Sequence, residues 1–203
     1  MRDPRGLAAE GDEQLGLLAT SRNAAVRKQV HVRWDVKTGG GAGADLIDPA
    51  KVEATTIRTL ISAAAPASWP PLSRVKPYET TVWQLDATLV AYKLETDGDY
   101  HLVISDSSNN TMVVEIPDPA AVDSSSLFVT QIKAARTAFD ARFGQQIAAL
   151  RAIAQPADVS APMIAHVSVP VRVTGIGFFD FAHGATGAAP NSIELHPILS
   201  IQF

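Results

Sequence analysis

The chain has 203 residues, of which 46% are hydrophobic and 19% are charged, and it contains no cysteine. This length suffices for one domain with a sizeable core plus an appendage, and the composition is too apolar for a wholly disordered chain. The absence of cysteine excludes disulfides, thiolate metal ligands and a cysteine nucleophile. No apolar run is long enough to predict a membrane-spanning helix.

Charge is distributed unevenly along the sequence. Residues 1–76 contain 11 Lys/Arg and 8 Asp/Glu, a net charge of +3, whereas residues 77–203 contain 6 and 13, a net charge of −7. An acidic surface repels a phosphate backbone, because affinity for nucleic acid rests largely on cationic contacts. Nucleic acid is therefore an unfavourable partner, and we expect a small molecule or a protein instead.

The N-terminal region, residues 1–76, is predicted to be a partly disordered arm that wraps a domain formed by residues 77–203. Residues 1–21 lack the apolar segment of a secretory signal, so the protein stays inside the cell or an export signal lies outside this sequence. Apolar and polar residues alternate over 30–36, which predicts a short strand. A partial apolar stripe that follows Asp48-Pro49 predicts a helix over 51–63. Trp34 and Trp69 are expected to anchor the arm by packing.

Three strands are predicted after residue 79, where the pattern of apolar residues changes to a period of two. Residues 81–92 form a long alternating stretch, followed by shorter ones over 100–105 and 111–116. Acidic, Gly, Ser and Asn residues over 95–99 and 106–110 favour tight turns between them. The sequence therefore predicts a meander of three strands.

A helix and two further strands complete the predicted domain. Apolar residues recur at steps of three and four over 128–154, with Gly144 as a possible division between two helices. Alternation over 167–174 and apolar residues over 193–201 predict the last two strands. The predicted core contains Trp83, Leu85, Leu102, Ile104, Val114, Phe139, Val171, Val173, Leu195 and Leu199.

This order of elements predicts a mainly β, α+β fold. Three meandering strands, a helix and two strands match the five-stranded Greek-key barrel of the OB-fold, with the helix between strands three and four. The competing interpretation is an open α+β sheet with the helix packed on one face. The number of strands, the long first strand and the position of the helix favour the barrel.

Three stretches of the sequence carry a family resemblance: TVWQLDATLVAYKLETDGDYHLVISD over 81–106, NTMVVEIPDP over 110–119, and VTGIGFFDFAHGATGAAPNSIELHPILSI over 173–201. They resemble a family of bacterial proteins with an OB-fold-like domain and a terminal GFFDxxHGxxGxAPNxxELHPxL motif. The likeness runs from about residue 36 to the end. It implies no particular activity, and it implies export for many members, which leaves the localisation of this chain open.

The richest group of chemically useful residues lies near the C-terminus. It comprises Asp180, His183, Asn191, Glu194 and His196. His101 and Glu115 are expected near the same surface, because the second and third strands are predicted to display His101, Val103, Val113 and Glu115 outward. If Ile193 and Leu195 point into the core, Glu194 and His196 point outward together, because alternate strand residues share a face. Two histidines with carboxylates suit a divalent metal, for which His183, Glu194 and His196 are the candidate ligands.

Structural roles compete with each of these functional interpretations. Polar residues in a glycine-rich loop often bind backbone groups. The acidic turn of Glu95, Asp97 and Asp99 lacks the spacing of an EF-hand and is expected to be solvated. No nucleophile elbow or phosphate-binding loop is present. We therefore expect a non-enzymatic binding module with no cofactor. The alternatives are a metal-dependent, nuclease-like hydrolase acting on phosphodiesters, and a self-associating surface protein.

Overall fold

The computed structural model describes residues 33–68, 71, 73–95, 97–153, 164–181 and 185–203. Among them are six strands: β1 (Val52–Ala54), β2 (Val82–Leu94), β3 (Tyr100–Ser105), β4 (Thr111–Ile116), β5 (Ala165–Phe179) and β6 (Ile193–Gln202). The helices are α3 (Trp34–Lys37), α4 (Ile57–Ile61), α5 (Val129–Ile153) and the 3₁₀ turns η1 (Ala44–Leu46) and η2 (Tyr78–Thr80). The mainly β, α+β class and the predicted order of strands and helix are confirmed.

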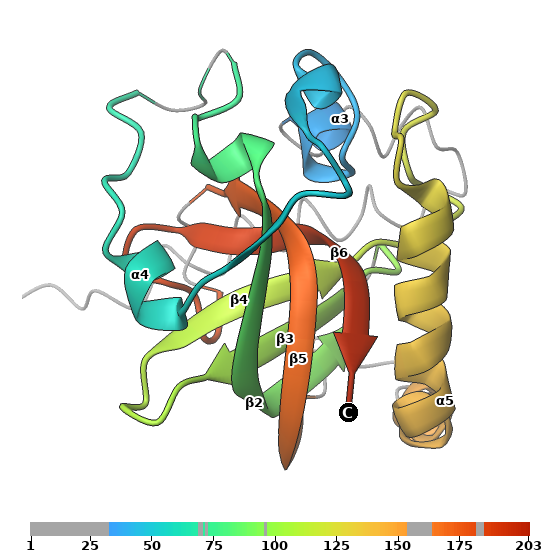
Figure 1. The fold of residues 1–203 in the computed structure, drawn as a ribbon. Coiled ribbons are helices and arrows are strands. Elements are labelled where there is room, and N and C mark those ends of the chain that lie inside the picture. The colour runs from blue at the N-terminus through green and yellow to red at the C-terminus, as the bar shows by residue number, and fades with distance from the viewer. Residues whose placement is uncertain (1–32, 69–70, 72, 96, 154–163, 182–184) are drawn as a thin grey trace, which may run out of the picture.

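The strands form one sheet with the order β1-β2-β3-β4-β6-β5, and β2 also pairs with β5. The five longer strands thereby close into a ring, beside which α5 runs along β6 (Figure 1). Most pairings are antiparallel, but β4 and β6 pair in parallel at Val114 and Leu195. The predicted number of five strands was one too low, because β1 adds a short parallel pairing to β2.

The main core is made by alternate residues of the strands together with one face of α5. Phe139 of α5 is fully buried and stacks against Tyr92, Tyr100 and Phe143. Nine of the ten predicted core residues are buried, whereas Trp83 is only partly buried against the same cluster. Leu199 belongs instead to a second, smaller cluster with Val82, Phe128, Ile132, Ile176 and Ile47.

Local structure before residue 80 differs from the sequence predictions. Residues 34–37 form a helical turn rather than a strand, and residues 52–54 form a strand where a helix was expected. The predicted helix is shortened to α4, which Thr56 caps by accepting a hydrogen bond from the Thr59 amide. Trp34 is buried and its Nε1 donates to the Ala121 carbonyl at 2.8 Å, while Trp69 lies outside the described residues. The division into an arm and a domain stays a prediction.

α5 is continuous through Gly144, so this glycine does not divide the helix in two. A glycine inside a helix costs about 1 kcal/mol relative to alanine, and packing on either side outweighs that cost. Phe143 and Ile147, on either side of Gly144, are both buried against the main core. No helix of the described residues is long and apolar enough to cross a membrane.

The outer face of β3 and β4 was expected to be exposed, and this expectation was wrong. His101, Val103, Val113 and Glu115 are each 4% exposed or less. The chain between β5 and β6 crosses this face so closely that a Cβ on Gly187 would overlap the side chain of Val103. A second buried layer, rich in charged residues, therefore lies outside the strand ring.

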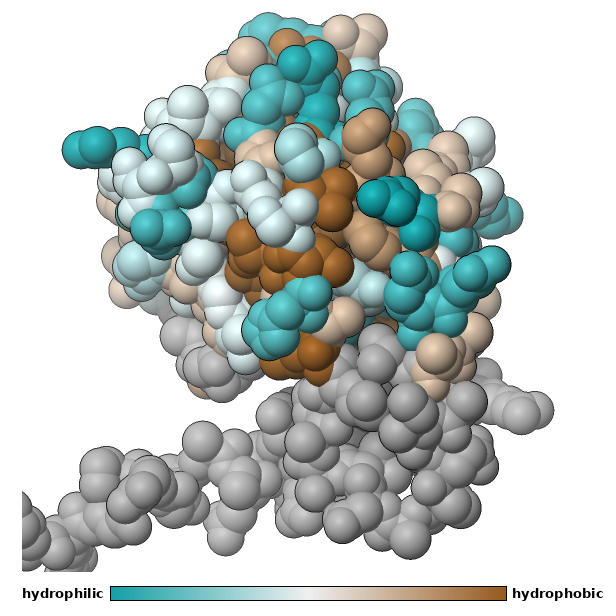
Figure 2. Space-filling model, turned by 90° about the horizontal axis from the view of Figure 1, so that it is seen from below, coloured by the Kyte–Doolittle hydropathy of each residue, from teal (hydrophilic) through white to brown (hydrophobic). Residues whose placement is uncertain are grey.

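One surface of the molecule is notably apolar. Figure 2 shows hydrophobic residues gathered in the middle of the face seen from below, with hydrophilic residues around them. The exposed large hydrophobic residues of the described chain include Leu46, Val52, Leu127, Phe181 and Phe203. The self-association hypothesis requires an exposed apolar patch, and self-association stays a prediction.

Candidate functional site

Lys37, at the end of α3, is the centre of the buried charged layer. Its Nζ lies 3.2 Å from Oδ2 of Asp180, 3.4 Å from Oε2 of Glu115 and 3.9 Å from Oε1 of Glu194. The Lys37 side chain is 11% exposed, and those of Glu115 and Glu194 are 5% and 7% exposed. One ammonium group is thus shared by three carboxylates that come from β4, β6 and the end of β5.

Strand pairing explains how these groups meet. Glu115 follows Val114, which pairs with Leu195 of β6, so Glu115 lies beside both Glu194 and His196. On its other side Glu115 faces His101 directly across the β3–β4 pair. The outward side chains of three adjacent strands consequently converge, and α3 supplies the cation that faces them.

His101 makes two hydrogen bonds that hold the layer together. Its Nδ1 lies 2.9 Å from Oε1 of Glu115, and its Nε2 lies 3.1 Å from the carbonyl oxygen of Thr186. Both ring nitrogens therefore face acceptors, which favours the doubly protonated imidazolium. Burial alone lowers the pKa of His101, but the hydrogen bond and attraction to Glu115 raise the pKa above its usual value.

His196 is fully buried, although an outward position on β6 was expected for it. Its Nδ1 lies 3.2 Å from Oε2 of Glu115 and 3.3 Å from Oε1 of Glu194. Its Nε2, on the opposite edge of the ring, lies 3.8 Å from Oδ2 of Asp99. Glu194 and His196 do share one face of the strand, but that face is covered rather than open to solvent.

Asp97 and Asp99 are buried in the turn between β2 and β3. One oxygen of Asp97 accepts a hydrogen bond from the Asp99 amide at 3.0 Å, and Oδ1 of Asp99 accepts one from the Asp118 amide at 2.7 Å. These bonds fix the turn, whose Gly98 has a φ of 95°. The expected solvated turn is therefore a buried one, and Oδ2 of Asp99 is directed at His196.

The pKa values follow from burial and from this crowding of charges. Burial alone lowers the pKa of Lys37, but attraction to Glu115, Asp180 and Glu194 raises it well above its usual value. Burial alone raises the pKa of Glu115, but Lys37 and the two histidines lower it well below its usual value. Lys37 and Glu115 are thus the most firmly ionised pair of the layer.

The remaining buried acids are affected in the opposite direction. Burial, followed by repulsion from Asp180, raises the pKa of Glu194 well above its usual value. Burial and repulsion from Asp97 raise the pKa of Asp99, and burial and repulsion from Glu95 raise that of Asp97 to about 6. The layer has more carboxyl groups than its cations can neutralise.

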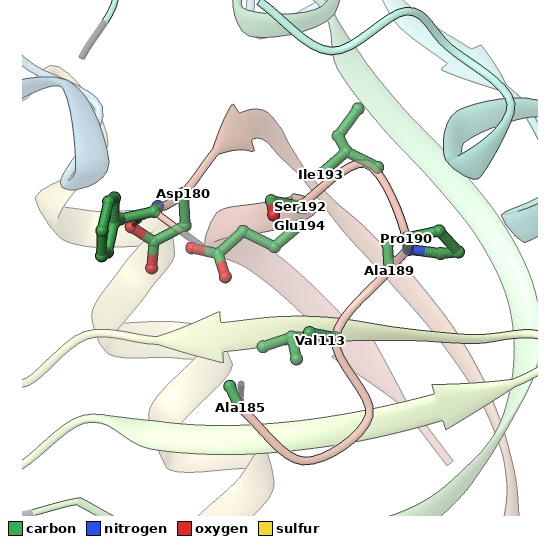
Figure 3. A pocket seen from close by; sticks show the side chains of 10 residues that line it. Val113, Asp180, Ala185, Ala189, Pro190, Ser192, Ile193 and Glu194 are labelled. Carbon is green, nitrogen blue, oxygen red and sulfur yellow. Dashed lines mark hydrogen bonds between the residues drawn. The ribbon is translucent and has the colours of Figure 1, made fainter. Parts of the chain in front are cut away.

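A pocket of about 210 Å³ opens beside this layer. Figure 3 shows the carboxylates of Asp180 and Glu194 side by side at one end, with Val113 and Ala185 opposite them. The pocket lies between β4, the start of β6 and the chain that joins β5 to β6. Its other lining residues are Phe181, Ala188, Ala189, Pro190, Ser192 and Ile193.

The sequence-predicted residues are distributed as follows. Asp180, Glu194, His196 and His101 come together around Lys37 and Glu115. Asn191 is turned away from them: its Nδ2 donates to the carbonyls of Leu60 and Ala63, each at 3.0 Å, which ties the chain before β6 to α4. His183 lies outside the described residues.

Sequence reasoning missed Lys37, the cation at the centre of the site. It lies 143 positions before Asp180 and in a four-residue helix without a recognisable pattern. The available signal was indirect. Glu115 interrupts an otherwise apolar strand, and a carboxylate buried there requires a cation nearby.

Comparisons with known proteins found no match to this chain among family models, curated proteins or solved structures. The resemblance described above for residues 36–203 therefore stays a prediction. Functional inference rests on the chemistry of the buried charged layer and of the pocket beside it.

Proposed function

We propose that this chain is an OB-fold-like barrel that acts as a non-enzymatic binding module, and that its pocket binds a small ligand carrying a positively charged nitrogen. The observation that carries this proposal is the pair of adjacent carboxylates, Asp180 and Glu194, at one end of a pocket with otherwise mostly apolar walls. Apolar walls with a few convergent polar groups are typical of small-molecule sites.

Charge supports a cationic ligand. Asp180, Glu194 and Glu115 all lie around the ammonium group of Lys37. A ligand ammonium beside Asp180 and Glu194 would offset the repulsion between them and form charge-assisted hydrogen bonds. The volume of about 210 Å³ suits a small amine rather than a nucleotide or a peptide.

The ring of strands supports the barrel. The closed pairing order, with a helix between β4 and β5, supports the proposed five-stranded Greek-key barrel. The metal-dependent hydrolase stays the alternative hypothesis, but Lys37 already lies among Glu115, Asp180 and Glu194. A resident ammonium at this place favours binding over metal-dependent hydrolysis there.

Binding of n-propylammonium tests the proposal, with the neutral isostere n-propanol as the matched probe. Titrated into the ¹⁵N-labelled full chain, n-propylammonium should shift the amide signals of Val113, Ser192 and Ile193, whereas n-propanol should not. Asp180→Asn should weaken binding by about tenfold or more, the value of one charged hydrogen bond.

Asp86→Asn is the matched control, because Asp86 is exposed and pairs with Arg172 away from the pocket. This variant should bind n-propylammonium as the wild type does. Equal shifts with both probes, or shifts scattered over the surface, would contradict the proposal.

A further inference from the structure

The acidic turn before β3 and the histidine of β6 form a second cluster that the proposed binding pocket does not use. Asp99, Glu115 and His196 are each 4% exposed or less. Each offers one ligand atom, and these atoms all lie within 4.8 Å of one another. The three residues come from the turn before β3, from β4 and from β6, so the sheet and the hydrogen bonds of the turn fix their positions.

Two oxygen atoms in this cluster have unused hydrogen-bonding capacity. Oδ2 of Asp99 and Oε2 of Glu115 are buried, and neither accepts a hydrogen bond from any group among the described residues, although Oε2 of Glu115 forms an ion pair with Lys37 at 3.4 Å. A buried carboxylate oxygen without a hydrogen bond is costly, so native structures rarely leave one without a compensating ion or water. Both oxygens face the imidazole of His196, at 3.8 Å from Nε2 and 3.2 Å from Nδ1 respectively.

A neighbouring group of acidic residues lacks this property. Glu95, His101 and Glu115 also bring ligand atoms together. There, however, His101 already binds Oε1 of Glu115 at 2.9 Å, and Glu95 forms an ion pair with Lys93 at 2.9 Å. The charges of that group are therefore paired with one another. Oδ2 of Asp99, by contrast, accepts no hydrogen bond from the described residues and lies on the side of His196 away from Glu194.

We propose that Asp99, Glu115 and His196 form a buried site for a divalent transition metal ion such as Zn²⁺ or Mn²⁺. One imidazole with two carboxylates is a donor set that suits these ions better than Ca²⁺, which prefers six or more oxygen ligands. Ligand atoms about 2.1 Å from such an ion lie roughly 3–4 Å apart. The observed separations therefore require only small side-chain movements.

Lys37 lies beside this site, because its Nζ is 3.4 Å from Oε2 of Glu115, one of the oxygens proposed as ligands. Its ammonium group is held by Asp180 and Glu194 as well as by Glu115. Glu115 and Glu194 face the Nδ1 edge of His196, whereas Asp99 faces the Nε2 edge. A metal held by one ring nitrogen of His196 together with Asp99 and Glu115 would add positive charge to a layer that has more carboxyl groups than its cations neutralise.

The experiment uses the untagged full chain, stripped with a chelator and dialysed against Zn²⁺. We expect one Zn²⁺ per chain by elemental analysis and a melting temperature that rises with Zn²⁺ concentration, because a ligand of the folded state stabilises it. Ca²⁺ should give a much smaller shift. A wild-type chain that retains no Zn²⁺ and melts unchanged would overturn the proposal.

Asp99→Asn is the informative variant, because the amide oxygen can still accept the hydrogen bond from Asp118. We expect it to lower Zn²⁺ affinity by about 100-fold or more. Asp86→Asn is the matched control, and Asp180→Asn, which removes a pocket carboxylate, should also retain Zn²⁺. Unchanged affinity in Asp99→Asn would place the metal elsewhere and overturn the proposal.

A measurement on the wild type keeps the test independent of how the variant folds. Substoichiometric Mn²⁺ broadens NMR signals near its binding site. We expect loss of the amide signals of Asp99, Glu115 and His196 before those of the turn at 106–110, which lies at the opposite end of the β3–β4 hairpin. Broadening centred on any other part of the chain would contradict the site.

Discussion

At the scale of single residues, Lys37 supplies the positive charge that makes burial of the charged layer energetically possible. Removing a charge from water costs several kcal/mol, and a buried carboxylate is stable only when a cation or hydrogen bonds replace the lost solvent. Lys37 replaces that solvent for Glu115, Asp180 and Glu194 together. The same network explains why the pKa of Glu115 is lowered although the residue is fully enclosed.

We expect Lys37→Met to lower the free energy of unfolding by about 3 kcal/mol, because it leaves buried carboxylates without their cation. Urea denaturation at neutral pH measures this change. The matched control is Lys51→Met, at an exposed lysine paired with Glu53, which should change stability by less than about 0.5 kcal/mol.

A double variant separates lost pairing from lost packing. Adding Glu115→Gln to Lys37→Met should recover part of the loss, because the carboxylate that lacks its cation is then neutral. If Lys37→Met proved as mild as Lys51→Met, the central role of Lys37 would be wrong.

At the scale of elements, local periodicity predicted what depends on local sequence. The alternating residues of β2, β3 and β4 and the helical spacing of α5 each reflect burial against one core, so these elements were found at nearly their observed bounds. The four-residue helix α3 and the three-residue strand β1 are too short for such a pattern. Their structures depend on contacts made with distant residues.

The candidate site was predictable only in part for the same reason. Strand alternation correctly placed Glu194 and His196 on one face, with His101 and Glu115 near the same surface. Alternation cannot tell what covers that face. The chain that crosses Val103 and the cation of Lys37 both come from far away in the sequence, so the face appeared solvent-exposed and Lys37 was not identified.

Two glycines test how closely the chain between β5 and β6 crosses β3. Gly187 has a φ of 81°, and a Cβ there would overlap Val103, so Gly187→Ala should destabilise the protein by about 2 kcal/mol. Gly144 lies in α5, where a Cβ would meet only Asp140 at 3.7 Å. Gly144→Ala should therefore stabilise it by about 0.5–1 kcal/mol.

Thermal melts of both variants check these signs. The Gly187→Ala protein should also show shifted amide signals at Val113 and Ser192, because the pocket wall moves with the crossing chain. A Gly187→Ala protein as stable as the wild type would show that this chain does not press on β3.

At the scale of the whole molecule, residues 34–47 connect the N-terminal region to several separate parts of the fold. Trp34 hydrogen-bonds the chain after β4, Lys37 neutralises the charged layer, and Ile47 packs in the second cluster with Phe128 and Ile176. Thr38 accepts hydrogen bonds from the Asp123 amide at 3.2 Å and, through its carbonyl, from Ser126 at 2.7 Å. Residues 34–47 thus contribute contacts to the core and to the charged layer, and the stability of the fold is expected to depend on them.

Two deletions should consequently have opposite outcomes. Deleting residues 1–29 should leave a cooperatively folded protein, because that stretch has little apolar periodicity with which to offset its ordering entropy. Deleting residues 1–47 should abolish the cooperative transition. Loss of the buried Trp34 is expected to cost about 3–5 kcal/mol, and loss of the Lys37 cation from its buried pair is expected to cost a similar amount. Together these losses approach the whole free energy of unfolding of a typical domain. Near-UV circular dichroism during heating distinguishes the two, and a sharp transition of the shorter chain near the wild-type melting temperature would show that residues 34–47 are dispensable.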